Sequence, residues 1–327
     1  MHTYSKIFLL VTFVSAGLIM SRCVNDDSDE KKALEAKLIK NYLDANGIST
    51  DTKTPGGIYY VEVLQGTGLS PVSGDYVVVN YTGRYIENNE IHETTDESLK
   101  TDWSKASLYS NYVYGPVKFK AGYSLTGINE GLSLMKEGGK ALLVLPSATA
   151  FHDYVPLVYD MELLKVIKEP ESYEDTALLE CRTTFGYDSS TFYNGIWYKE
   201  TNTITDDQTV ENNDTVYFTF KGKLVDWFEG VIDISRIFDT NGSDSEPVKW
   251  VFGKSAALTD NIVAIPSGLV TAIDSMRKGS EATIILPYNK AFKEAGLIHQ
   301  IYRYTIVPPY QTIMYDIKIQ DIKRPVK

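Results

Sequence analysis

The sequence predicts an α+β protein made of two successive units, each an antiparallel sheet wrapped on one short helix. The first reason is an internal repeat: MKEGGKALLVLPSATAF at 135–151 returns as MRKGSEATIILPYNKAF at 276–292, offset by 141 residues. The second is a series of short runs rich in β-branched and aromatic residues, which are typical of strands. The third is one amphipathic helical pattern in each copy. Solenoid repeats have periods of roughly 20 to 50 residues, so a repeat this long indicates two whole domains.

Composition excludes several classes of function. Apolar residues make up 43% of the 327 residues, enough for two hydrophobic cores. There are 32 basic and 43 acidic residues, giving a net charge of −11 with no basic stripe. Binding to a phosphate backbone needs clustered Lys and Arg, so nucleic acid is not an expected partner. The four His and two Cys show no ligand spacing, so we expect no metal site.

The first residues are typical of an exported protein. Residues 1–22 combine Lys6 with an apolar run at 7–20, too short for a membrane span of about 20 residues, and predict a signal peptide. Cys23 stands where bacterial lipoproteins carry their lipidated cysteine, and the acidic stretch at 25–30 resembles the export signal of Bacteroidetes lipoproteins. Arg22 departs from the small residue usual before that cysteine. We expect a lipid anchor at Cys23 that holds the protein at the outer membrane or the cell surface. A position on the periplasmic side is the alternative. The alternative is an ordinary signal peptide with a leftover cysteine. If Cys23 is acylated, Cys181 is the only remaining thiol, and we expect no intrachain disulfide.

The remaining chain divides into four segments. Residues 23–50 hold the anchor and a spacer helix, since apolar residues recur at helical spacing before Gly47. Residues 51–168 form unit 1, and residues 195–327 form unit 2. Between them, residues 169–194 predict a linker with a short helix. 

The elements of each unit follow from local patterns. In unit 1, strands are expected at 58–63, 76–81, 117–120, 141–145 and 157–166. Ile128, Leu132 and Met135 share one helical face, with Gly138 expected just past the helix end, and Leu269, Ile273, Met276 and Gly279 repeat this in unit 2. The repeat offset rises from 141 at Phe151/Phe292 to 156 at Tyr159/Tyr315, which predicts an insertion of 15 residues between Phe292 and Tyr315.

This order of motifs resembles the FKBP-type peptidyl-prolyl cis-trans isomerases. The similarity is carried by GDYVVVNYTG, PVKFKAG, a helix ending in MxxG, an apolar strand running into Leu-Pro and Ala-Phe, and LVYDMELLKV, and it covers nearly all of both units. It implies two tandem FKBP-like domains that act on proline-containing polypeptides. Rotation about an Xaa-Pro bond has a barrier of about 18–20 kcal/mol and makes or breaks no covalent bond, so no cofactor or metal is expected. A dry aromatic cup that solvates the planar amide poorly would favour the twisted transition state.

The resemblance also implies site residues in unit 2. Phe238, Asp239 and Tyr315 are expected to be catalytic. The substrate-binding positions are Phe220, Trp250, Ile265, Leu269, Phe292 and Val307. Phe220 replaces a Tyr of the family, and Leu269 replaces a Trp at the floor of the cup.

In unit 1 the resemblance implies a degenerate copy. A possible second pocket comprises Tyr81, Phe119, Ile128, Phe151 and Tyr159. The Phe-Asp pair is missing there, because 91–94 reads IHET; Glu93 is a candidate acid with its register uncertain by one residue, and His92 is expected at the surface.

Each assignment has a structural alternative. Aromatic residues on strands are often core residues, and Asp239 could simply begin a turn in DTNGSDSE. The leading hypothesis is therefore an exported prolyl isomerase or folding helper, and its rival is a non-catalytic lipoprotein that binds peptide or protein. A glycan-binding lipoprotein has only the abundance of Tyr, with 23 residues, in its favour.

Overall fold

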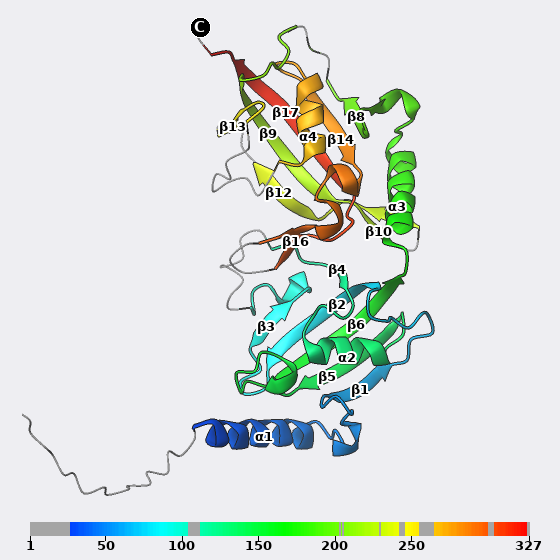
Figure 1. The fold of residues 1–327 in the computed structure, drawn as a ribbon, viewed down its shortest axis with the longest axis vertical. Helices are drawn as coiled ribbons and strands as arrows, with labels where there is room; N and C mark the ends of the chain where they lie inside the picture. Colours follow the sequence, from blue (N-terminus) through cyan, green and yellow to red (C-terminus); the bar gives the residue numbers. More distant parts are fainter. Residues whose placement is uncertain are drawn as a thin grey trace, which may run out of the picture.

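The computed structural model describes residues 27–103, 112–202, 204, 206–228, 230–241, 246–254, 265–299 and 304–325. Cys23 and the expected signal peptide lie outside these residues. The two units follow one another along the long axis of the molecule (Figure 1). Within the described ranges, no helix combines the length and apolar character needed to cross a bilayer. The same residues contain no group of three or more His, Cys, Asp and Glu side chains arranged to hold a metal ion.

Unit 1 is built on a six-stranded antiparallel sheet in the order β1-β5-β6-β2-β3, with β4 also paired to β2. Its strands are β1 (Tyr59–Leu64), β2 (Tyr76–Tyr85), β3 (Ile91–Thr94), β4 (Val117–Lys120), β5 (Gly139–Leu145) and β6 (Leu157–Ile167). The strands expected from the sequence are all present with small shifts at their ends, and β3 is an addition. 

Unit 2 repeats this arrangement. Its seven-stranded sheet has the order β12-β9-β17-β14-β8-β7, with β13 paired to β9. The strands are β7 (Phe192–Tyr193), β8 (Ile196–Glu200), β9 (Thr215–Leu224), β12 (Ile237–Asn241), β13 (Val248–Val251), β14 (Glu281–Leu286) and β17 (Ile313–Lys323). Two hairpins are added to it, formed by β10 (Asp226–Phe228) with β11 (Val231–Asp233), and by β15 (Leu297–Ile298) with β16 (Thr305–Val307). The second hairpin lies inside the predicted insertion.

One short helix packs on the inner face of each sheet: α2 (Thr126–Leu134) in unit 1 and α4 (Ser267–Ser275) in unit 2. Both helices bury the predicted apolar stripe, with Leu132 and Ile273 at most 1% exposed. The expected helix ends were wrong. The helices stop at Leu134 and Ser275, while Gly138 and Gly279 lie in later turns at φ 85° and 84°. Gly138 donates its N–H to the carbonyl of Leu163 in β6, and Gly279 donates its N–H to the carbonyl of Ile319 in β17.

A second helix covers the outer face of each sheet, α1 (Asp27–Ala45) in unit 1 and α3 (Pro170–Phe185) in unit 2, as the sequence predicted for both (Figure 1). From α1, Ile39 and Leu43 pack on Val144 and Val158. From α3, Leu178 and Cys181 pack on Ile285 and Met314, which occupy the repeat positions of Val144 and Val158. The repeat therefore includes the helix before each sheet. Burial raises the pKa of the Cys181 thiol to about 12.

The remaining helical turns are short. They are 3₁₀ helices at η1 (Thr50–Thr52), η2 (Glu97–Leu99), η4 (Ser147–Thr149), η5 (Ser189–Thr191), η6 (Tyr288–Lys290) and η7 (Lys293–Ala295). The turns η4 and η6 both follow a Leu-Pro pair and lead into the Ala-Phe motif, so they place Phe151 and Phe292 equivalently.

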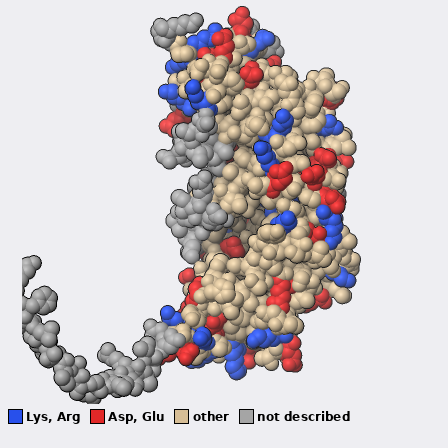
Figure 2. All heavy atoms as spheres, in the orientation of Figure 1, with Lys and Arg blue, Asp and Glu red and all other residues tan. Residues whose placement is uncertain are grey.

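The two units touch through polar and aromatic contacts. A buried ion pair joins Lys118 of β4 to Glu174 of α3, and their side chains are 7% and 3% exposed. The second carboxylate oxygen of Glu174 accepts the backbone N–H of Thr312 at 2.9 Å. The rings of Tyr76 and Tyr310 meet edge to face at 5.3 Å. Figure 2 shows acidic and basic side chains interspersed over the described part of this face, with no continuous basic surface on it.

Candidate active site in two aromatic cups

In unit 2, the predicted site residues gather at the inner face of the sheet beside α4. Strand β9 supplies Phe220, β12 supplies Phe238, β13 supplies Trp250 and β17 supplies Tyr315. Leu269 from the first turn of α4 and Val307 from β16 belong to the same apolar cluster, and Ile265 and Phe292 pack against it. The structure thus brings all the predicted aromatic and aliphatic positions together. Most of them are less than one tenth exposed, while Ile265 and Phe292 are half-buried.

The rings of this unit 2 cup meet at steep angles. Phe238 lies 6.0 Å from Phe292 at 90° and 5.7 Å from Tyr315 at 75°. Phe220 lies 5.8 Å from Tyr315 at 66°. Edge-to-face pairs of this kind stabilise aromatic clusters beyond the burial of their area. The result is a rigid apolar wall made by four rings from three strands and the segment after β14.

A bulge turns two consecutive residues of β12 toward this wall. The pairing of β12 with β9 shifts register between Ile237 and Asp239, and Asp239 then pairs with Gly222. Gly222 also pairs with Tyr315 on its other side. A bulge allows neighbouring residues to approach the same face, which a regular strand does not. Asp239 is half-buried, and its charge adds to burial in raising the pKa of the Tyr315 phenol well above its usual value.

Gly222 is required by the close packing of the rings over it. A Cβ at this position would lie 2.7 Å from Cζ of Phe238 and 2.9 Å from Cε1 of Tyr315. Gly83 has the same role in unit 1, where a Cβ would lie 2.6 Å from Cε1 of Tyr159. Side chains cannot approach this closely, so both cups depend on the missing Cβ.

In unit 1 the same strands assemble a second cup around a carboxylate. Glu93 pairs with Gly83 as Asp239 pairs with Gly222, so the register that the sequence left open places Glu93 at the acid position. Its two oxygens accept hydrogen bonds from the hydroxyls of Tyr81 at 3.2 Å and Tyr159 at 2.8 Å. Burial, followed by the charge of Glu93, raises the pKa of both phenols well above the usual value.

His92 takes the place of Phe238 in this unit 1 cup. Its ring lies 5.4 Å from Phe151, and its Nδ1 is 2.9 Å from the hydroxyl of Tyr85. His92 is therefore half-buried rather than a plain surface residue. Phe151 is 49% exposed, and Ile128 is buried at the floor. Phe119 on β4 is half-buried against the same cluster.

Comparison with known proteins gives the family. A model of the FKBP-type peptidyl-prolyl cis-trans isomerases matches residues 68–164 and 206–320, which together are more than half of the chain. The chain belongs to this family. All the residues named above for the two cups lie within the matched ranges, so each cup is part of an FKBP-type domain.

Several relatives carry the name of the same enzyme family. A probable FKBP-type isomerase FkpA from Neisseria meningitidis is 31% identical over 151 residues, covering 42% of this chain and 50% of the relative. FkpA from Escherichia coli K12 is 30% identical over 167 residues, covering 48% and 53%. The chain spans about half the length of these curated relatives. Among solved structures, the three FKBP domains of wheat FKBP73 cover 83% of this chain and 97% of their own, with 18% identity and a TM-score of 0.29.

Some residues near the cups of this FKBP-type chain were not found from the sequence. Val113, in the segment before β4 of unit 1, packs against the core cluster of unit 2. The neighbouring ring of Tyr112 lies 5.5 Å from Tyr304, which precedes β16. Trp103 is buried and donates its indole N–H to the carbonyl of His92 at 3.2 Å. The contacts of Val113 and Tyr112 join segments far apart in the chain, and no local pattern of the sequence indicates any of these contacts.

Proposed function

We propose that the protein is a peptidyl-prolyl cis-trans isomerase whose active site is the unit 2 cup. The observation that carries this proposal is the convergence of Phe238, Phe292 and Tyr315 beside the half-buried carboxylate of Asp239. The bulge in β12 supports a functional role for this pair, because bulges commonly re-aim side chains next to active sites. The family match and the names of the relatives support the same activity.

The proposed mechanism is desolvation of the Xaa-Pro amide. The planar amide has a large dipole from resonance, and a twisted amide has lost most of that resonance. An apolar wall of rings stabilises the planar dipole less than water does, so binding there costs the ground state more than the transition state. In this scheme Phe238, Phe292 and Tyr315 hold the proline ring, while Trp250, Ile265, Leu269, Phe220 and Val307 exclude water. Asp239 provides the polar edge that orients the amide.

Unit 1 has a different proposed role in this scheme. Glu93 accepts hydrogen bonds from the hydroxyls of Tyr81 and Tyr159, whereas unit 2 has Phe220 at the repeat position of Tyr81. A polar ring, His92, stands where unit 2 has Phe238. These features favour a cup that binds polypeptide without fast isomerisation. The clients of the whole chain would be proline-containing polypeptides.

The proposed location is outside the cytoplasm. The signal at 1–22 and Cys23 support export and a lipid anchor at the outer membrane or cell surface. In this arrangement α1 separates the anchor from unit 1, on which it packs. Mass spectrometry of the protein purified from its native membrane tests the anchor, since acylation adds the mass of fatty acyl chains to the peptide that begins at Cys23.

The activity is tested by cis-to-trans isomerisation of a short Xaa-Pro peptide. The protein should accelerate it, Asp239→Asn should lower kcat/KM about tenfold or more, and Glu93→Gln should leave it within about twofold. A folded protein that gives no acceleration contradicts the proposal. Loss of activity in Glu93→Gln but not in Asp239→Asn would place the active site in unit 1 instead.

A non-catalytic binding function is the rival candidate. It is favoured by one observation, the depth of burial in the unit 2 cup, where Phe238 and Tyr315 are 2% and 1% exposed and Leu269 fills the floor. Under this alternative, a proline peptide binds with an affinity that Phe292→Ala reduces, while the isomerisation rate stays at that of buffer.

A further inference from the structure

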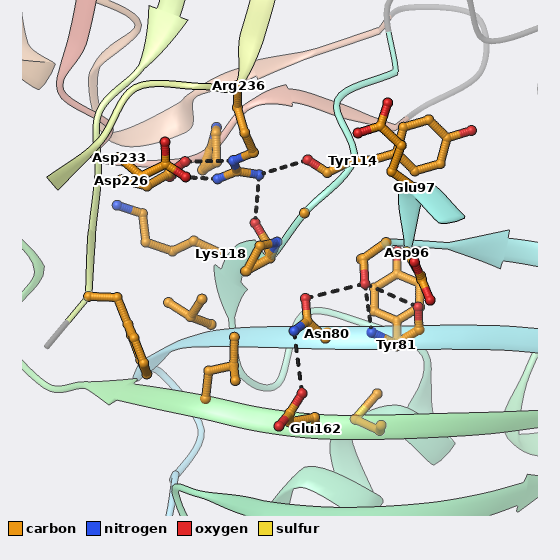
Figure 3. Close-up of a pocket in the computed structure, with 18 of the residues that line it drawn as sticks. Asn80, Tyr81, Asp96, Glu97, Tyr114, Lys118, Glu162, Asp226, Asp233 and Arg236 are labelled. Atoms are coloured by element: carbon orange, nitrogen blue, oxygen red, sulfur yellow. Dashed lines mark hydrogen bonds and ion pairs between the residues drawn. The ribbon is translucent and has the colours of Figure 1, made fainter. Parts of the chain in front are cut away.

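The space between the two units forms a cavity of about 1000 Å³, which lies outside the unit 2 cup and shares only Tyr81 with the unit 1 cup residues named above. Its floor is the outer face of the unit 1 sheet, where residues of β2 and β6 line it. Its opposite wall comes from unit 2, chiefly the β10–β11 hairpin and the segment that leads to β12. Figure 3 shows Asn80 and Glu162 on the floor strands, facing Asp226, Asp233 and Arg236 across the cavity.

The walls of the cavity are held in place by polar contacts that cross between the units. Arg236 is paired with Asp226 at 2.6 Å, and it also donates to the carbonyl of Pro116 in unit 1 at 2.9 Å (Figure 3). The buried pair of Lys118 and Glu174 also lines the cavity. A cavity whose walls are fixed by charge-assisted bonds is preorganised, so a ligand does not have to order it.

The lining carries an excess of negative charge. Seven carboxylates and three cationic side chains line the cavity, and each of the cations is already ion-paired with one of these carboxylates. Asp96, Asp160 and Asp233 lie outside these three pairs, and Glu97 lies 3.9 Å from Lys100, which is not part of the lining. Desolvation raises the pKa of the Asp160 carboxyl, with the charge of Arg84 opposing it. An excess of carboxylates repels phosphate-bearing ligands and attracts cationic ones.

Apolar side chains are exposed at the same place. Val63, Phe228 and Val231 line the cavity and are 65%, 40% and 66% exposed. Along β6, Asp160 and Glu162 line the cavity two residues apart, at an interval of about 6.6 Å set by strand geometry, and Leu164 follows where the pairing of β6 with β2 shifts register. An extended polypeptide presents its alternate side chains at the same spacing. The surface therefore combines apolar and acidic positions in a pattern that an extended chain can match.

We propose that this cavity binds an extended segment of client polypeptide that carries Lys or Arg among aliphatic residues. The segment lies across β2 and β6, with its cationic side chains toward Asp160 and Asp233 and its apolar side chains against Phe228 and Val231. The site holds a client through a segment without proline, next to but apart from the two cups. The proposal does not depend on isomerase activity, because its ligand contains no Xaa-Pro bond.

The test is fluorescence anisotropy of the full protein with a short, labelled, proline-free peptide of alternating Lys and Leu. A peptide with Glu in place of Lys is the matched control ligand. The Lys peptide should bind, more weakly as salt is raised, and the Glu peptide should bind at least about tenfold more weakly. Asp160→Asn should weaken binding of the Lys peptide about threefold and Asp160→Lys about tenfold.

A matched variant separates this site from general charge effects. Asp274 is exposed on α4, away from the cavity lining, so Asp274→Lys makes the same charge change and should leave binding unchanged. Val78→Trp should block binding by filling the floor, with an unchanged melting curve as the check on folding. A photo-crosslinking residue in the peptide should label β2, β6 or β10. Equal binding of both peptides, equal effects of Asp160→Lys and Asp274→Lys, or crosslinks confined to the cups would each overturn the proposal.

Discussion

Replacing the glycine beneath each cup distinguishes the two units. In Gly222→Ala, the new Cβ meets Cζ of Phe238 at 2.7 Å and Cε1 of Tyr315 at 2.9 Å. Ordinary contacts begin at 3.4 Å, so the rings must retreat by roughly 0.7 Å. Overpacking of this kind destabilises a fold by about 1–3 kcal/mol. Ala also lowers the conformational entropy of the unfolded chain relative to Gly, which offsets about 0.4–1 kcal/mol of this destabilisation. The net destabilisation expected is about 1–2 kcal/mol.

The effect on activity should be larger than the effect on stability. A displacement near 1 Å in a catalytic arrangement can reduce the rate about 100-fold, so Gly222→Ala should lower kcat/KM for an Xaa-Pro peptide at least about tenfold. Gly83→Ala makes the equivalent clash with Tyr159 at 2.6 Å and should destabilise unit 1 similarly while sparing the rate.

The assays are isomerisation kinetics and hydrogen exchange, which reports the local stability of β9 in one unit and β2 in the other. Full activity in Gly222→Ala with exchange confirming the strain, or loss of activity in Gly83→Ala, would refute the assignment of the site to unit 2.

Other predictions follow from burial. Tyr315 stays protonated in the folded state while an unfolded phenol ionises near pH 10, so the free energy of unfolding should fall as pH rises above 10. In urea titrations, Tyr315→Phe should reduce the slope of that fall by up to about 1.4 kcal/mol per pH unit. An unchanged slope would contradict this prediction. Glu174→Ala should lower the free energy of unfolding by about 3–5 kcal/mol, because it leaves Lys118 buried and unpaired. The double variant with Lys118→Met should be less destabilised than Glu174→Ala. Additive losses of the two single variants in urea unfolding would count against this prediction. In a Cys23→Ser variant, the Cys181 thiol should not react with a thiol reagent at pH 8 until denaturant is added, because burial raises its pKa to about 12. Rapid labelling of the native protein would contradict this burial.

The repeat made most of the fold accessible from the sequence. Because Pro146 and Pro287 stand at equal offsets from Met135 and Met276, the helix, the next strand and the Ala-Phe turn could be placed twice with no gap. Strand alternation then gave the core faces, since side chains on one strand alternate between the two sides of a sheet. 

The site was harder to predict than the fold, for a geometric reason. The sequence alone did not fix the alignment of Glu93 with Asp239, because Glu93 follows Gly83 more closely than Asp239 follows Gly222. The difference arises because unit 2 has the additional β10–β11 hairpin between these two positions. Only the strand pairing, with its bulge, shows that both acids sit opposite a glycine. The cavity between the units could not be predicted from the sequence either. It depends on contacts between distant segments, such as Arg236 with Pro116, which leave no periodic pattern in the sequence.

The helix ends show how a local rule can be overridden. A glycine after an amphipathic stripe usually marks the residue just past a helix, and Gly138 fits that pattern. The structure instead ends α2 earlier, at Leu134, because Met135 turns to extended geometry and buries its side chain in the core. Gly138 then provides the positive φ of the turn that starts β5.

The most direct test of the central claim is the rate of Xaa-Pro isomerisation by the purified protein beside Phe238→Ala and its unit 1 counterpart, His92→Ala. Phe238→Ala removes the ring that contacts both Phe292 and Tyr315, so the rate should fall toward that of buffer, while His92→Ala should leave it nearly unchanged. Equal rates for the protein and Phe238→Ala, with both shown to be folded, would contradict an active site in the unit 2 cup.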